Sequence, residues 1–349
     1  MSHTVVISPS GHQFTVSGDE PLLEAALRQG VPLAYGCRSG NCGSCAGQLR
    51  SGEIAYRGER PAGLTAAANE QGTVLICQAH ALSDLEIEAN VVDAPAHIPI
   101  KTLPARVVTL SRLSHDVMLM ELKLPASERL QFLAGQYLEI LLKGGKARAF
   151  SIANPPHDDA MLQLHIRAVP GGFFTQQVFH ELKEKALLRV RGPLGTFFLR
   201  EDSDRPIILV AGGTGFAPVK AIIEHAVARG IQRPMHLFWG VRARRDLYLG
   251  TLAQSWADQN DTVRVTPVLS DPAPEDGWHG AVGLVHERVM DSYPDLSGFD
   301  AYLCGPPPMI AAARAAFIAR GLPEDRLFYD SFEYSKDVRA ALAHEPTTA

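Results

Sequence analysis

The sequence predicts a multidomain chain of the α+β and α/β classes, and three observations point to this. The chain has 349 residues, which suggests two or three domains at roughly 100–200 residues each. Short β-rich runs, several with alternating apolar residues, dominate residues 103–204, as is typical of an antiparallel β-barrel. From Arg205 onward, buried-strand runs alternate with apolar-periodic helices, which favours a parallel sheet.

The composition excludes several classes of protein. Hydrophobic residues make up 46% and charged residues 20% of the chain, so disorder and fibrous repeats are excluded. The net charge of −5 argues against a general nucleic-acid binder. No apolar run reaches the ~18 residues of a membrane span, and residues 1–14 lack the pattern of a secretion signal. We therefore expect a cytoplasmic protein with no nucleic-acid or membrane partner.

Residues 1–92 are expected to form the first domain. Gly30 follows the expected helix as a C-cap. The segment carries nine acidic residues against five basic ones, so most of the net negative charge of the chain lies here. The expected elements are strands at 3–8, 12–16 and 73–77 and a helix at 21–28.

Residues 93–102 hold two prolines and no helical or strand period, which indicates a linker. The second domain is expected at 103–204, the third at 205–340, and a tail at 341–349. Strands of the second domain are expected at 117–124, 137–142, 162–169 and 187–191.

The third domain is expected to alternate strands with helices in the order that parallel sheets require. Its strands are expected at 206–211, 235–239, 262–269, 299–304 and 326–329. Its helices are expected at 218–229, 246–258, 286–293 and 308–320.

Four of the five cysteines form the strongest motif in the sequence. Cys37, Cys42 and Cys45 have the spacing C-x₄-C-x₂-C, and 31 residues separate Cys45 from Cys77. This is the plant-type pattern for a [2Fe–2S] cluster held by four thiolates. A zinc site would more usually show two C-x₂-C pairs, and only one is present. Glycines in the loop let backbone N–H groups approach the sulfurs.

A second candidate site follows a strand-like run, Arg-Ala-Phe-Ser at 148–151. An arginine and a serine hydroxyl can hold a phosphate and a ribityl chain, and Phe150 can cover an isoalloxazine face. The Gly-Gly pair at 171–172 opens a helix at Thr175, where free N–H groups offer a second phosphate seat. Taken alone, such runs are also typical of a strand end and of a turn.

A third candidate site lies at the carboxyl edge of the expected parallel sheet. Residues 211–218, Ala-Gly-Gly-Thr-Gly-Phe-Ala-Pro, allow a tight turn that places a helix N-terminus against a pyrophosphate. Cys304 ends a later strand and begins Cys-Gly-Pro-Pro-Pro-Met at the same edge. Cys304 is either an inert buried thiol or a residue packed near the C4 atom of a nicotinamide.

Together these stretches resemble the oxygenase-reductase class of the ferredoxin–NADP reductase superfamily, in the arrangement with an N-terminal plant-type ferredoxin domain. Reductases of benzoate and terephthalate dioxygenases belong to this class, as does the reductase that partners CDP-6-deoxy-hexulose 3-dehydrase. The resemblance implies a β-grasp ferredoxin domain, an antiparallel β-barrel flavin domain and a parallel-sheet α/β nucleotide-binding domain. The residues that carry it are 35–45, 134–137, 148–156, 171–175, 211–220 and 304–309.

The resemblance also implies which residues hold each cofactor. Those implied for FAD are Arg148, Phe150, Ser151, Ile152, Ala153, Arg167, Gly172 and Thr175. Those implied for the nicotinamide path are Gly213, Thr214, Gly215, Cys304 and Met309, with Phe332 or Glu333 on the flavin side. Of these, Thr214, Cys304 and Glu333 are the candidate catalytic residues. The family usually has Tyr in place of Phe150, which bears on flavin affinity and on the choice of FAD over FMN.

The implied activity is that of an NAD(P)H-dependent oxidoreductase. Electrons would pass from NADH through FAD and the [2Fe–2S] cluster to a terminal oxygenase, either an aromatic-ring dioxygenase or a monooxygenase. A flavin is required between NADH and the cluster, because a hydride carries two electrons and the cluster accepts one at a time. The alternatives are a reductase for the CDP-6-deoxy-hexulose dehydrase, and a freestanding flavin or ferric reductase or redox sensor. The acidic first domain suits docking on a basic partner or simply solubility.

The choice of nucleotide depends on the loop after residues 235–239. Arg242, Arg244 and Arg245 lie in this loop, where an arginine can bind a 2′-phosphate and favour NADPH; a solvated charged loop is the alternative. No acidic residue directly ends the strand to select NADH. Members of the family nearest in pattern mostly use NADH, so NADH is expected and NADPH is the alternative.

Overall fold

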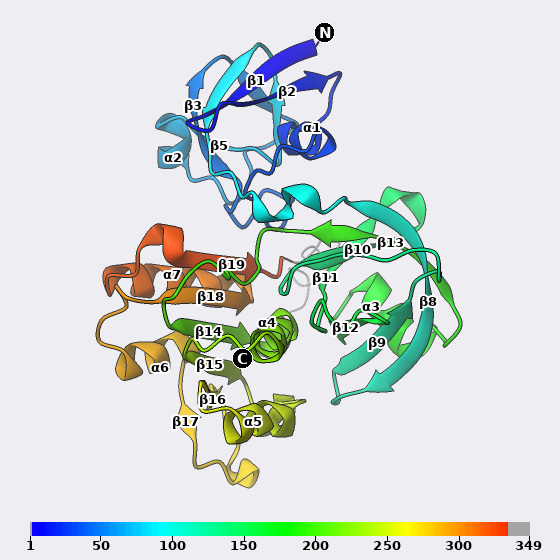
Figure 1. Cartoon of the computed structure of the whole chain (residues 1–349), viewed down its shortest axis with the longest axis vertical. Helices are drawn as coiled ribbons and strands as arrows, with labels where there is room; N and C mark the ends of the chain where they lie inside the picture. Colours follow the sequence, from blue (N-terminus) through cyan, green and yellow to red (C-terminus); the bar gives the residue numbers. More distant parts are fainter. Residues whose placement is uncertain (1, 334–349) are drawn as a thin grey trace. The chain divides into compact units, whose positions relative to one another are not determined.

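The computed structural model describes residues 2–333, and the chain divides after Pro99 into two compact units. In the first unit β1 and β7 are parallel, and the other strand pairs are antiparallel. The sheet order (Figure 1) is β2 (His12–Ser17), β1 (Ser2–Ser8), β7 (Leu85–Glu88), β3 (Ala46–Ser51) and β5 (Thr73–Leu75).

Helix α1 (Leu22–Arg28) packs on this sheet through an apolar side. Leu22, Leu23 and Ala26 are buried, and its polar Arg28 remains exposed. The strands expected at 3–8 and 12–16 and the helix at 21–28 are therefore confirmed. Five elements within residues 2–92 were not expected from the sequence: β3, β7, β4 (Ile54–Tyr56), α2 (Ala66–Glu70) and β6 (Ala79–Ala81).

Residues 93–102, expected to have no helical or strand period, contain both. A 3₁₀ turn, η1 (Ala94–His97), forms because Ala96 N–H donates to the Asp93 carbonyl at 2.9 Å. β8 (Lys101–Arg112) begins within the segment. Its start is set by the antiparallel pairing of Lys101 with Gly192, which the local sequence does not show.

The second unit begins with a six-stranded antiparallel sheet. An antiparallel bridge between Ile152 and Leu164 joins its two edges, which closes the sheet into a barrel. The barrel expected from the alternating runs is therefore confirmed. Its helix is α3 (Phe173–His180), and the strand order is β11 (Ala147–Ser151), β10 (Tyr137–Leu141), β13 (Leu187–Leu194), β8, β9 (Val117–Lys123) and β12 (Leu162–Arg167).

The rest of the unit is built on a six-stranded sheet in which every pair is parallel, as the strand–helix alternation predicts. The order (Figure 1) is β17 (Ala281–Val282), β16 (Val263–Leu269), β15 (Met235–Val241), β14 (Ile207–Gly212), β18 (Asp300–Gly305) and β19 (Leu327–Ser331).

Helices cover both faces of this parallel sheet because its central strand is buried throughout. In β14, Leu209 packs with α4 (Phe216–Ala228) and α5 (Gly250–Gln259). Val210 points the other way and packs with α6 (Val285–Ser292) and α7 (Pro307–Ala319). A strand buried on both faces explains why residues 206–211 form a continuous apolar run instead of an alternating one.

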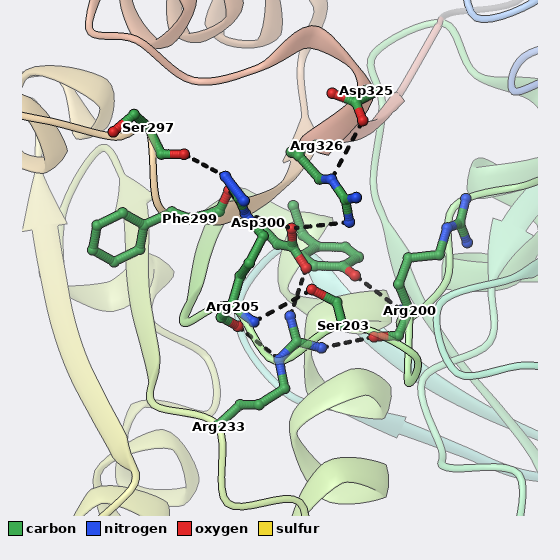
Figure 2. Close-up of polar contacts among 10 residues, drawn as sticks. Arg200, Ser203, Arg205, Arg233, Ser297, Phe299, Asp300, Asp325 and Arg326 are labelled. Carbon is green, nitrogen blue, oxygen red and sulfur yellow. Dashed lines mark hydrogen bonds and ion pairs between the residues drawn. The ribbon is translucent and has the colours of Figure 1, made fainter.

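The segment connecting the barrel to the parallel sheet is held by a polar network at the base of β14 and β18 (Figure 2). The Arg233 guanidinium donates to the Arg200 and Arg205 carbonyls, at 2.7 Å each. The Tyr302 hydroxyl accepts from Arg200 N–H at 2.9 Å. These bonds fix the path of the chain where it passes from one sheet to the other.

None of the helices within residues 2–333 is long and apolar enough to cross a membrane.

Candidate functional site

The four clustered cysteines of the first unit come together in space. Cys37, Cys42 and Cys45 lie in the loop between α1 and β3, and Cys77 follows β5. The side chains of Cys37 and Cys42 are in hydrogen-bonding contact, as are those of Cys45 and Cys77. Cys45 and Cys77 are buried, whereas Cys37 and Cys42 are half-buried. The loop and the strand end therefore bring four sulfurs to one place.

Backbone N–H groups of the loop point at these sulfurs. The Cys37 sulfur accepts from Cys42 N–H at 3.4 Å and from Ser39 N–H at 3.5 Å, and the Cys42 sulfur accepts from Cys37 N–H at 3.4 Å. Such donors stabilise negative charge on sulfur. The loop is thus arranged for thiolates.

The shape of the loop depends on a glycine at its tip. Gly40 has a φ of +77°, and a Cβ there would lie 2.8 Å from Gln78 and 2.9 Å from Pro61. Gln78 also donates from its amide to the Arg38 carbonyl at 2.8 Å. Arg38 itself adopts a φ of 58° and pairs with Glu24 of α1. Contacts from three parts of the unit therefore hold the loop open around the sulfurs.

The electrostatics of the cysteines fit a cluster held by thiolates. The hydrogen bond with the Cys42 side chain, helped by Ser39, lowers the pKa of Cys37 to about 5 against the effect of burial. The pKa of Cys45 is also lowered, chiefly by its hydrogen bond with Cys77. The same hydrogen bonds, with burial, raise the pKa of the partner thiols Cys42 and Cys77, so within each pair one sulfur ionises readily and the other keeps its proton. The four-sulfur donor set itself matches the [2Fe–2S] ligation that the spacing predicts.

In the barrel, a buried hydroxyl marks the second candidate site. Ser151 is 7% exposed, and its Oγ has no hydrogen-bond partner in the part of the chain that the structure describes. Phe150 precedes it and contacts Phe174 of α3 at 5.7 Å between ring centroids. Arg148, on the same strand, is half-buried. An unsatisfied buried hydroxyl is costly unless a ligand completes it, so these residues fit a bound flavin.

The backbone N–H groups of Ile152 and Ala153, two residues expected at the flavin, are hydrogen-bonded within the barrel. Ile152 N–H donates to the Gln136 carbonyl at 3.0 Å, and Ala153 N–H donates to the Gln163 carbonyl at 2.8 Å. The Ala153 carbonyl accepts from the Lys220 ammonium at 3.2 Å. Both residues are fully buried. Their N–H groups are therefore engaged within the protein and hold the strand end in place.

Arg167 and Thr175 extend this region on β12 and α3. Arg167 Nε donates to Asp116 at 2.7 Å, and its guanidinium lies 2.9 Å from where a Gly213 Cβ would be. The Thr175 hydroxyl donates to the Gly172 carbonyl at 3.0 Å, within the turn that precedes α3. Gly172 is the N-cap of α3, which begins at Phe173 and not at Thr175 as expected. Arg167 thus lies between the barrel and the nucleotide turn.

The third candidate site forms where β14 and β18 end side by side. A Cβ on Gly215 would lie 2.0 Å from the Cys304 carbonyl oxygen, so only glycine fits. Gly213 has a φ of +54°, and its carbonyl accepts from the Trp239 indole at 2.9 Å. Thr214 is half-buried between the two glycines. The turn is therefore held against the neighbouring strand ends directly before helix α4.

Met309 and the described end of the chain reach the same edge of the sheet. Met309 Sδ lies 2.6 Å from where a Gly212 Cβ would be. Phe332 N–H donates to the Gly305 carbonyl at 2.9 Å, and Glu333 accepts from the Ser331 hydroxyl at 3.0 Å. The structure thus brings Phe332 and Met309 beside the turn that contains the candidate nicotinamide residues.

Cys304 is fully buried, and its pKa is raised well above the usual range, first by burial and then by Asp330. Its thiol therefore stays neutral and serves to pack the strand end. This matches both interpretations of Cys304 from the sequence, since a packing role does not exclude a position near a nicotinamide.

Three residues that sequence reasoning missed organise this region. The Trp239 indole holds the Gly213 carbonyl, His165 Nδ1 lies 3.0 Å from the Tyr248 hydroxyl, and the ammonium of Lys220 reaches the barrel. The one signal in the sequence was a lysine within the apolar run 216–223. The partners lie 26 to 83 residues away along the chain.

The arginine loop after β15 is partly engaged. Arg242 pairs with Asp271 at 3.4 Å, and Arg244 donates to the Asp276 carbonyl at 2.9 Å. Arg245 is exposed. The loop therefore keeps its arginines at the carboxyl edge of the sheet, and two of them contact an acidic loop that follows β16.

Comparison with known families divides the chain in the same way. A 2Fe-2S iron–sulfur cluster binding domain matches residues 5–82, an oxidoreductase FAD-binding domain matches residues 104–199, and an oxidoreductase NAD-binding domain matches residues 209–315. The chain therefore carries domains for all three cofactors.

Full-length relatives share this arrangement. The CDP-6-deoxy-L-threo-D-glycero-4-hexulose-3-dehydrase reductase of Yersinia pestis is 40% identical over 96% of this chain and 100% of its own. A reductase component of terephthalate 1,2-dioxygenase from Comamonas is 34% identical over 96% and 98%. Among solved structures, the Amycolatopsis cytochrome P450 reductase is 34% identical, with a TM-score of 0.79 over 95% of this chain and 98% of that one.

Proposed function

This chain belongs to the family of reductases that join a 2Fe-2S domain to FAD- and NAD-binding domains. Within that family, we propose that its electron acceptor is a CDP-6-deoxy-hexulose 3-dehydrase. The chain is an iron–sulfur flavoprotein reductase that transfers electrons from NADH. The proposal extends this to the acceptor, and a relative that is 40% identical over its whole length supports it. The sequence alone had favoured a terminal oxygenase.

A terminal oxygenase remains the second candidate acceptor. The reductase component of terephthalate dioxygenase supports it, at 34% identity over nearly the full length. A freestanding flavin or ferric reductase is the third. We further propose that the protein acts in the cytoplasm, where thiols stay reduced and the cysteine ligands remain available.

FAD, when bound, accepts the electron pair of a hydride and releases it as single electrons that the cluster can carry. For this chemistry Arg148 would hold a phosphate, the Ser151 hydroxyl would bind the ribityl chain, and Phe150 would cover the ring. Arg167 and Thr175 lie close to the same strand ends and to the turn at Gly172. The backbones of Ile152 and Ala153 would then support the flavin indirectly, because their N–H groups are engaged.

The nicotinamide would lie at the carboxyl edge of the parallel sheet. Gly213, Thr214 and Gly215 give close backbone approach before α4, whose N-terminus attracts the pyrophosphate. Met309, Cys304 and Phe332 would line the path, and Glu333 would lie at its end on the flavin side. No general acid or base is required for this step, since a hydride carries both electrons with it and no proton has to be abstracted from NADH.

One observation supports the proposed path of electrons from NADH to the cluster: a single chain holds two sites of complementary chemistry. One is a set of four sulfurs with N–H donors aimed at them. The other is a nucleotide turn that adjoins a barrel with an unsatisfied buried hydroxyl. The first suits one-electron chemistry and the second suits hydride transfer.

An anaerobic titration of the holoprotein with NADH tests the electron path. We expect the flavin absorbance to bleach and the EPR signal of a reduced [2Fe–2S] cluster to appear, with NADPH less effective. Bleaching of the flavin with a silent cluster would favour the freestanding reductase instead.

The acceptor is tested by reconstitution with purified partners. With NADH present, we expect turnover of a CDP-6-deoxy-hexulose 3-dehydrase to depend on this protein. Turnover of an aromatic-ring oxygenase in its place would identify the second candidate. Rapid reduction of free flavin without either partner would support the third.

A further inference from the structure

The molecule contains a buried lysine that the proposed electron path does not use. Lys220 lies in α4 and is 8% exposed. Its ammonium donates to the Ala153 carbonyl at 3.2 Å and to the Glu224 carboxylate at 2.7 Å. Lysine is almost never buried unless it is paired, and burial of a charge costs several kcal/mol without partners. This position therefore needs a reason beyond packing.

The two partners of Lys220 belong to different parts of the unit. Ala153 follows Ser151 by two residues in the barrel, and Ser151 is the residue with the unsatisfied buried hydroxyl. Glu224 lies one turn further along α4 on the same helix. Helix α4 begins at Phe216, directly after the turn at Gly213–Gly215. One ammonium thus links the candidate flavin strand to the candidate nucleotide helix.

A second polar contact crosses the same boundary. His165, in β12 of the barrel, lies 3.0 Å from the Tyr248 hydroxyl of the nucleotide-binding part. Burial, and then the charge of Lys220, lower the pKa of His165 to about 3, so its ring is neutral. Lys220 therefore makes a charged contact across this boundary close to a second contact that is uncharged.

Removal of the ammonium would leave two groups unsatisfied. The Ala153 carbonyl is buried and would lose a donor, and a buried acceptor left without its partner destabilises the contact. Burial raises the pKa of Glu224, and its carboxylate would lose its nearest cation. Both effects would loosen the boundary between Ala153 and α4 and leave the rest of each part intact.

We propose that Lys220 is a positioning residue, which ties the flavin strand at Ala153 to helix α4 and so sets the separation between flavin and nicotinamide. The inference rests on the proposed function. Hydride transfer requires reacting atoms about 3–3.5 Å apart, and a displacement of about 1 Å can slow a reaction about a hundredfold. Lys220 itself touches neither the Gly213–Gly215 turn nor the Ser151 hydroxyl in these contacts, so its loss should affect geometry more than binding.

The test compares Lys220→Met with wild type and with Lys183→Met as a matched control at an exposed position. Anaerobic stopped-flow mixing of holoprotein with NADH measures flavin bleaching and the long-wavelength absorbance of the stacked flavin–nicotinamide pair. In Lys220→Met we expect bleaching at saturating NADH to slow at least tenfold and the long-wavelength band to weaken. The dissociation constant for NADH and the FAD content should stay within twofold of wild type.

A second variant keeps the test decisive if Lys220→Met does not fold. Glu224→Gln keeps the shape of the pair but removes its charge, and we expect bleaching to slow about threefold with FAD retained. Bleaching within twofold of wild type in the variants that fold would overturn the inference, as would slowing matched by lost FAD. Failure of NADH to bleach wild-type flavin would instead contradict the proposed function.

Discussion

The Arg233 guanidinium and the Asp300 carboxylate form an ion pair of 2.6 Å in which the side chains are 7% and 0% exposed (Figure 2). Arg233 lies two residues before β15 and Asp300 is the first residue of β18. Figure 2 also shows Arg205 and Arg326 turned toward this carboxylate, at 3.7 and 4.0 Å. Because Arg233 also holds the Arg200 and Arg205 carbonyls, the pair joins the base of the parallel sheet to the segment arriving from the barrel.

Arg233→Met is expected to destabilise the second unit strongly. Removal of one partner of a buried pair costs about 3–5 kcal/mol, because Asp300 would keep only its longer contacts to Arg205 and Arg326. Two connector carbonyls would also lose their donor. We expect the temperature of FAD release, followed by flavin fluorescence, to fall by about 10 °C. Arg229→Met, at a position that is 63% exposed with a 3.8 Å contact to Glu201, should shift it by less than about 2 °C.

Cys42→Ser is expected to separate the two halves of the electron path. A serine does not supply the thiolate that the cluster requires, so reduction of cytochrome c by NADH should be lost. Reduction of ferricyanide should continue, because flavin alone can support it. Both are measured by absorbance under the same conditions. Full rates in both assays would contradict a role of the cluster as a conduit.

Ser151→Ala is expected to weaken flavin binding without destabilising the flavin-free protein. The Ser151 hydroxyl has no partner within the described chain, so its removal relieves an unsatisfied buried group. With flavin present it would remove a hydrogen bond worth about 1–1.5 kcal/mol, which is about a tenfold rise in the FAD dissociation constant. Fluorescence titration of flavin-free protein measures this. Ser292→Ala, at an exposed site in α6, should leave the constant unchanged.

His165 is expected to make the second unit less stable as the pH falls. Its pKa is about 3 in the folded protein and about 6.5 unfolded. Between these values the unfolded chain binds the extra proton, so stability falls as pH falls. From pH 6.5 to 5 the loss is about 2 kcal/mol. Urea unfolding of wild type and His165→Gln at both pH values measures this loss. An equal change in the free energy of unfolding for the two proteins would contradict the role of His165.

Local sequence patterns predicted a strand correctly where its apolar residues form one uninterrupted or alternating run. The apolar run 206–211 became β14, and the run 137–142 became β10. The helix expected at 246–258 begins only at Gly250, because Asp246 accepts from Ala243 N–H and ends a 3₁₀ turn first. Strand β8, which begins at the end of the expected linker, was not predicted. Pro104 lies within it, and a proline argues against a strand.

The candidate site was predictable to the extent that its chemistry is local. The cysteine spacing, the glycine turn at Gly213–Gly215 and the Phe150–Ser151 step each occupy a short stretch. The expected backbone contacts of Ile152 and Ala153 were not predictable in detail, since their N–H groups pair with Gln136 and Gln163. That pairing depends on how the barrel closes.

The sequence by itself indicated the domain order, the four clustered cysteines and the three cofactor classes, because spacing and residue type set what a loop can hold. Tertiary structure alone decided the contacts between the barrel and the parallel sheet. Lys220 meets Ala153 across 67 residues, His165 meets Tyr248 across 83, and Arg233 meets Asp300 across 67. Such pairs form only when packing removes both partners from water, so no local pattern records them.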